Sequence, residues 1–128
     1  MLNQNTEYAE IGQRLISNLS EFEDIKDVTV AYLSSEKAKK RNGKIICGEC
    51  VKVAPNYSWC CPYDFMIIIY DQNIAGFNEY QLETLIRHEL HHIGVEQTSR
   101  GERYYIVPHD IEEFYEIIKD CGYDWSVI

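Results

Sequence analysis

The residues best suited to chemistry in this chain are His88-Glu89-Leu90-His91-His92, which contain the pattern HExxH. On an α-helix, His88 and His92 lie one turn apart and project from the same face. Two neutral imidazoles at that spacing can bind one Zn²⁺, and Glu89 can act as general base toward a metal-bound water. A catalytic zinc site also needs a third protein ligand. His109, which is the one histidine of the four outside this motif, is a candidate.

The motif must lie on a helix, and the flanking sequence predicts one over residues 78–93. Asn78 is a suitable N-cap, and Gln81 three residues later completes a capping-box pattern. Gly94 suits the left-handed position that ends a helix. Apolar residues recur between these ends at helical spacing; they are Leu82, Leu85, Ile86, Leu90 and Ile93.

Three segments carry more information than the short motif. Their sequences are YDFMIII (63–69), RHELHHIGV (87–95) and YIVPHDIEEF (105–114). In this order and at this separation they resemble the phage metallopeptidases, a compact zincin-like family. The resemblance extends over about two-thirds of the chain, from about residue 28 to residue 114. It implies that His88, His92 and His109 are the zinc ligands and that Glu89 is the catalytic carboxylate of a peptidase.

The expected chemistry follows from that ligand set. Three neutral histidines leave Zn²⁺ with its full double charge, which lowers the pKa of a bound water to about 7. Glu89 would take a proton from this water as it attacks a peptide carbonyl, and would pass the proton to the leaving amine. Arg103, Tyr104 and Tyr105 are candidates for an additional donor to the oxyanion.

Several neighbouring residues have more than one interpretation. His91 is expected at the surface or behind the ligands rather than on the metal. Asp110 either caps a final helix or orients a ligand histidine. Glu112 and Glu113 are rival third ligands to His109.

The cysteines raise a separate possibility. Cys47 and Cys50 form a CxxC pattern, and Cys60 and Cys61 follow it, so four thiolates could hold a structural zinc. However, the second pair is adjacent, and in a regular strand Cys47 and Cys50 would point to opposite faces. We therefore expect buried free thiols, as also for Cys121.

Composition limits the class of protein. The 128 residues predict a single domain spanning the chain, and the net charge of −9 argues against nonspecific binding to nucleic acid or to an anionic membrane. No apolar run approaches the length of a membrane span, and the first residues lack the features of a secretory signal. The cytoplasm is the expected location, that of the host if the protein is phage-encoded. The basic run at 36–41 is expected to be a solvated loop, with contact to an acidic substrate or DNA as the alternative.

The remaining elements predict an α+β fold. An amphipathic helix is expected from Thr6 to about residue 21, and strands at 28–33, 44–53 and 65–70. The HExxH helix follows, then an extended segment at 104–107 and a helix that begins at Asp110. This order is that of a minimal zincin: a small antiparallel or mixed sheet with an N-terminal helix, the HExxH helix and a C-terminal helix.

Three functions are compatible with these residues. The first is a zinc-dependent peptidase acting on a peptide or protein. The second is a zinc-containing binding protein without catalysis, such as a phage factor that occupies a host target. The third is a zinc hydrolase of an amide outside a peptide. The presence of Glu89 disfavours the second, since a structural site needs no base.

Overall fold

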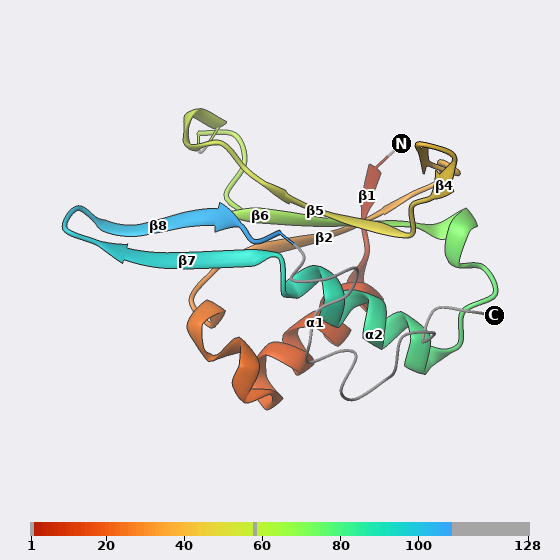
Figure 1. Cartoon of the computed structure of the whole chain (residues 1–128), viewed down its shortest axis with the longest axis horizontal. Helices are drawn as coiled ribbons and strands as arrows, with labels where there is room; N and C mark the ends of the chain where they lie inside the picture. Colours follow the sequence, from red (N-terminus) through yellow and green to blue (C-terminus); the bar gives the residue numbers. More distant parts are fainter. Residues whose placement is uncertain (1, 58, 109–128) are drawn as a thin grey trace.

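The computed structural model describes residues 2–57 and 59–108, and in them the chain is α+β. A mixed sheet carries both helices on one face, and a hairpin extends from one end (Figure 1). The strand order is β1 (Leu2–Gln4), β2 (Val30–Ser35), β6 (Phe65–Tyr70) and β5 (Gly48–Lys52). Strands β2 and β6 are parallel, and the two outer pairs are antiparallel. The predicted closing helix, with Asp110 and Cys121, lies outside the described residues.

The central strand β6 has the bounds that its continuous apolar run predicted. Phe65, Ile67 and Ile69 are completely buried on the face that carries the helices. Ile68 and Tyr70 form a smaller cluster with Leu33 on the opposite face. Because both faces are covered, the strand needs apolar side chains at successive positions rather than at alternate ones.

Strand β2 begins two residues later than predicted. The amide of Val28 donates to the carbonyl of Ile25, so Val28 still belongs to a turn. The amide and hydroxyl of Thr29 both donate to Asp64, and pairing with β6 starts only after this junction. The turn ends a 3₁₀ segment, Ser20–Ile25, which replaces the last part of the predicted first helix.

Helix α1 (Thr6–Asn18) begins at Thr6, as predicted, and Asn5 caps it, because the Asn5 side chain accepts from the amide of Tyr8. Its buried side includes Tyr8, Leu15 and Ile16, so the helix is amphipathic, as predicted. Its contacts with α2 and with β2 place it beside the second helix under the sheet.

Helix α2 (Glu79–Leu90) has the predicted capping box of Asn78 and Gln81. It ends earlier than predicted, because Ile93 already begins strand β7 (Ile93–Thr98). The prediction of a left-handed Gly94 is wrong, since the described glycines with positive φ are Gly43 and Gly101. Gly94 instead pairs with Tyr105 of strand β8 (Gly101–Ile106), and an added Cβ would lie 2.5 Å from the Tyr105 ring.

The predicted strand at 44–53 is divided. Strands β3 (Lys40–Arg41) and β4 (Lys44–Ile45) form a small hairpin, and β5 follows separately. Asn42 and Gly43 join β3 to β4 with φ of 53° and 78°, the left-handed pair that Asn-Gly favours in tight hairpin turns. Within the described part of the chain, no helix has the length and hydropathy needed to cross a membrane.

Candidate metal centre

His88, Glu89 and His92 converge at the C-terminal end of α2. Their potential ligand atoms all lie within 4.8 Å of one another, and they are the group suited to a metal ion among residues 2–57 and 59–108. Nε2 of His88 is 4.0 Å from Oε2 of Glu89. His88 and Glu89 are 9% and 4% exposed. The convergence predicted from the HExxH spacing is therefore present, although α2 ends at Leu90 and His92 lies just beyond the helix.

His92 is held by two hydrogen bonds to one residue. The amide of Val107 donates to the carbonyl of His92 at 2.7 Å. The Nδ1 of His92 lies 2.6 Å from the carbonyl oxygen of Val107. A carbonyl oxygen only accepts, so Nδ1 carries the proton and Nε2 is left with a lone pair that a metal can use. A ligand histidine commonly has such a carbonyl partner, which orients the ring and raises its basicity. The donor set therefore fits a divalent metal ion.

Gly48 of β5 lies against Glu89, and a side chain at this position would crowd the carboxylate. A Cβ at Gly48 would lie 3.3 Å from Oε2 of Glu89 and 3.3 Å from the backbone oxygen of Ile68. Both contacts are tighter than side chains normally allow, and the backbone cannot easily move away. Sequence reasoning did not identify this glycine, because its only local signal was its place between two cysteines.

The cluster opens into a cleft of about 500 Å³ between α2, β5 and the end of β8. Strand β5 is the last strand of its sheet, so one of its edges faces this side of the molecule without a strand partner in the described residues. The residues that line the cleft include Arg41, Gly48, Glu49, Cys50, Lys52, His88, Glu89, His92 and Ile106.

A comparison with known families bears on this geometry. A family model described as putative phage metallopeptidase matches residues 1–128, the whole chain. The chain belongs to this family. Comparison with curated proteins and with solved structures gave no match. The family description and the His-Glu-His group together imply a metal ion and point to a peptidase.

In this phage metallopeptidase family member, His91 points away from the cluster. Its Nε2 contacts the carboxylate of Glu21, and its ring lies 4.8 Å from the ring of Phe22. Arg87 binds the same carboxylate through Nε at 3.0 Å and Nη2 at 2.5 Å. Glu21 therefore links the last turn of α2 to the 3₁₀ segment after α1.

The three candidate oxyanion donors lie along β8 outside the cleft. Tyr104 packs at 5.9 Å from the Phe65 ring. Tyr105 lies over Gly94, and Arg103 pairs with Glu96 and stacks on Tyr105. The structure does not bring these residues to His88 and Glu89. His109, Asp110, Glu112 and Glu113 lie outside the described residues, so their roles stay predictions.

The cysteines of this family member have different surroundings. Cys47 and Cys50 both pack against the main core. They can share this side because Cys47 precedes β5, so the alternation of side chains along the strand does not apply to it. Burial and the charge of Glu89 raise the pKa of both thiols. Cys60 is exposed near Tyr57, and Cys61 is half-buried. The described metal-competent group contains no cysteine, and the structural role of these thiols stays a prediction.

Proposed function

We propose that the protein is a zinc-dependent peptidase in which His88, His92 and His109 hold the metal and Glu89 is the general base. The observation that supports this proposal best is the pairing of His92 with the Val107 carbonyl next to a buried carboxylate. A site of purely structural purpose would need the oriented histidine but not the carboxylate.

Zinc bound there would polarise the scissile carbonyl and acidify the attacking water. Glu89 then has the proton-transfer role: its carboxylate takes a proton from that water and donates it to the leaving nitrogen. The lack of a side chain at Gly48 gives the carboxylate room in this position. The edge of β5 that has no strand partner among the described residues could accept an extended peptide through main-chain hydrogen bonds along the cleft.

His109 is the third ligand in this proposal because of its place after Val107. Two residues of chain span at most about 7 Å, so an imidazole two positions beyond Val107 is within reach of the His92 side chain that Val107 contacts. Glu112 and Glu113 lie farther along the chain. The four described cysteines are free thiols, which fits a reducing cytoplasm as the place of action.

Substitution of Glu89 by Gln tests the base directly. The variant should fold and bind zinc like the wild type, and should lose hydrolysis by about 10²–10⁴-fold. Glu83→Gln is the matched control, because Glu83 is an exposed carboxylate on the same helix. Activity would be followed on a randomised peptide library, with zinc content measured in each preparation.

A second variant tests the ligand set. His109→Ala should strip zinc from the site, whereas His91→Ala should not, because His91 faces Glu21. Full zinc occupancy in the His109 variant would move the third-ligand role to Glu112 or Glu113. Unchanged hydrolysis in the Glu89 variant would refute the mechanism. Zinc binding without any hydrolysis by the wild type would instead favour a binding protein.

A further inference from the structure

The basic residues of this acidic protein are concentrated beside the cleft. Residues 37–52 contain six of the 12 Lys and Arg residues and one carboxylate, Glu49, which gives this segment a net charge of +5. The whole chain carries −9. This contrast places a positive surface next to the candidate metal centre within a molecule that otherwise repels anions.

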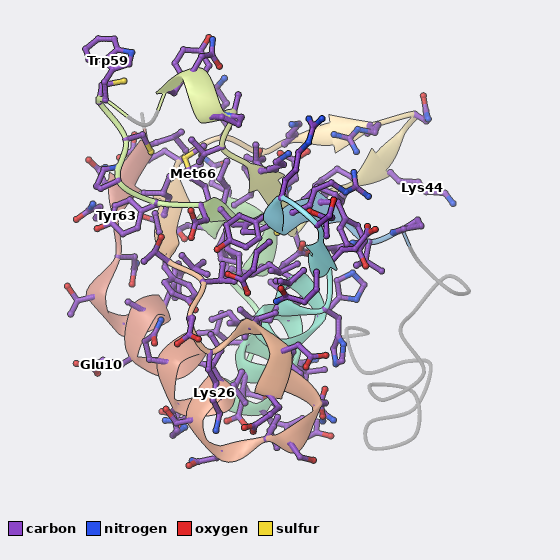
Figure 2. The ribbon with its side chains drawn as sticks, turned by 90° about the vertical axis from the view of Figure 1, so that its left-hand side faces the viewer. Glu10, Lys26, Lys44, Trp59, Tyr63 and Met66 are labelled. Carbon is purple, nitrogen blue, oxygen red and sulfur yellow. The ribbon has the colours of Figure 1, made fainter. Side chains whose placement is uncertain are left out.

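The fold arranges this segment around the cleft. Arg41 of β3 and Lys52 of β5 line it directly. Side chains alternate along a strand, so Lys52 lies on the same face of β5 as Gly48, which borders Glu89. Lys40 and Lys44 extend the surface onto the exposed hairpin, and Lys44 projects from the periphery in Figure 2. We call Lys39, Lys40, Arg41, Lys44 and Lys52 the basic rim.

The positive charges of the basic rim outnumber the carboxylates that form ion pairs with them. Lys39 and Arg41 share one carboxylate, that of Glu49, at 2.9 Å and 2.6 Å. Burial alone would raise the pKa of Glu49, but the hydrogen bonds from Tyr70 and Lys39 and the charges of Lys39 and Arg41 outweigh burial and lower it. Among the described residues, no carboxylate lies within 4.0 Å of Lys40, Lys44 or Lys52.

Several basic residues away from the rim are paired with acidic ones. Arg14 pairs with Glu83, Lys26 with Glu23, and Arg103 with Glu96. These pairs neutralise their surfaces locally, whereas the rim keeps a positive surplus. A surplus that borders a cleft of this size attracts oppositely charged ligands and disfavours cationic ones.

We propose that the basic rim selects peptide substrates that carry Asp or Glu side chains next to the bond placed over Glu89. The proposal rests on the peptidase function proposed above and names its substrate class. A peptide fits better than nucleic acid, because a polyanion extending beyond the rim would meet the acidic remainder of the molecule.

Matched peptide pairs test this selection. Peptides cleaved from a randomised library would be resynthesised with Glu replaced by Gln next to the scissile bond, and kcat/KM compared within each pair. The acidic member should be preferred by about two- to fivefold for each charge contact. The preference should shrink as salt is added, because these contacts are exposed. Equal rates within the pairs at low salt would overturn the proposal.

Variants of the basic rim test whether its lysines cause the preference for acidic peptides. In Lys40→Gln/Lys44→Gln/Lys52→Gln, the preference for the acidic member should fall toward one. Lys26→Gln removes an exposed positive charge away from the β3–β4 hairpin and should keep the preference; Figure 2 shows Lys26 in the lower part of the molecule and Lys44 at the upper right. A preference that survives the triple substitution would overturn the proposal.

A binding measurement separates this proposal from the peptidase function. Zinc-loaded Glu89→Gln protein would be titrated with a fluorescent Glu-rich peptide, its Gln counterpart and a single-stranded oligonucleotide. Tighter binding of the Glu peptide, weakened by the triple substitution, supports the rim even if no hydrolysis is ever seen. Tighter binding of the oligonucleotide through the same lysines would overturn the peptide assignment in favour of a nucleic-acid surface.

Discussion

At the residue scale, the main-chain carbonyl of Val107 complements the HExxH motif. It fixes the proton of His92 on Nδ1 and thereby directs Nε2 toward the cluster. Loss of such a hydrogen-bond partner typically lowers metal affinity or activity by about 10–100-fold. The orientation of His92 therefore depends on Val107, which directly follows β8 and lies 15 residues beyond His92 in the chain.

Gly48→Ala is expected to reduce activity without preventing folding. The new methyl group would stand about 3.3 Å from the Glu89 carboxylate and from the Ile68 carbonyl, so the carboxylate must shift by a few tenths of an ångström. Because misplacement of about 1 Å can cost about 10²-fold, we expect a loss near tenfold in kcat/KM. Peptide hydrolysis and thermal unfolding would be measured together.

Gly43→Ala is the control for this variant. Gly43 has nothing within 4 Å of its added Cβ, but its φ is positive, so alanine there strains the turn without touching the cleft. It should lower stability and leave the hydrolysis of a neutral peptide intact. Full activity of Gly48→Ala would show that Glu89 does not depend on this space.

The residues of the His-Glu-His group could be predicted from sequence more readily than the residues that orient them or leave space for them. His88, Glu89 and His92 follow from a spacing that a helix imposes. Val107 could not be predicted, because a main-chain carbonyl is present at every residue and carries no side-chain signal. The role of Gly48 could not be predicted either, since it depends on which strand packs against Glu89.

At the scale of elements, Glu21 fixes the end of α2. One carboxylate binds both Arg87 and His91, and the three side chains are only 11–15% exposed. It joins the helix that carries the motif to the segment that follows α1. Since His88 and Glu89 lie between Arg87 and His91 in sequence, this contact also restrains the turn that presents them.

Glu21→Gln is expected to destabilise the protein by about 2 kcal/mol, because it removes the charged acceptor shared by two largely buried donors. Zinc affinity should fall as well, since the end of α2 gains freedom. Chemical denaturation with and without zinc would measure both effects.

Glu83→Gln provides the comparison for this change. Glu83 also joins the helices, through Arg14, but both side chains are about half exposed. Such a pair contributes about 0–1 kcal/mol. Equal effects of the two substitutions would show that Glu21 is no more than a surface ion pair.

Element boundaries were predictable where a local signal was unambiguous. The capping box set the start of α2, and the Asn-Gly pair set the β3–β4 turn. The end of α2 was not predictable, because a glycine after apolar residues suits a helix end and also a strand under an aromatic ring. Gly94 has the second role, and its partner Tyr105 is supplied by a strand that the sequence only partly revealed.

At the scale of the whole molecule, we expect one equivalent of zinc. The Cys47→Ser/Cys50→Ser variant should fold and keep its metal, because both thiols pack against the core as neutral groups beside Glu89. Elemental analysis and thermal unfolding of both proteins would check this expectation. Two equivalents in the wild type, with one lost in the variant, would instead establish a four-thiolate site with Cys60 and Cys61.

The order of the elements along the chain has a consequence for synthesis. The strands of the mixed sheet lie within residues 2–70, whereas the site helix and Val107 come later. At about 5–20 residues per second, the last strand of the sheet is synthesised a few seconds before the β7–β8 hairpin is complete. The β5 residues that line the cleft are thus synthesised before the residue that orients His92. Under the proposed peptidase function, an unfinished chain that ends before Val107 would lack the carbonyl that orients His92, and with it the means to digest other nascent chains around it.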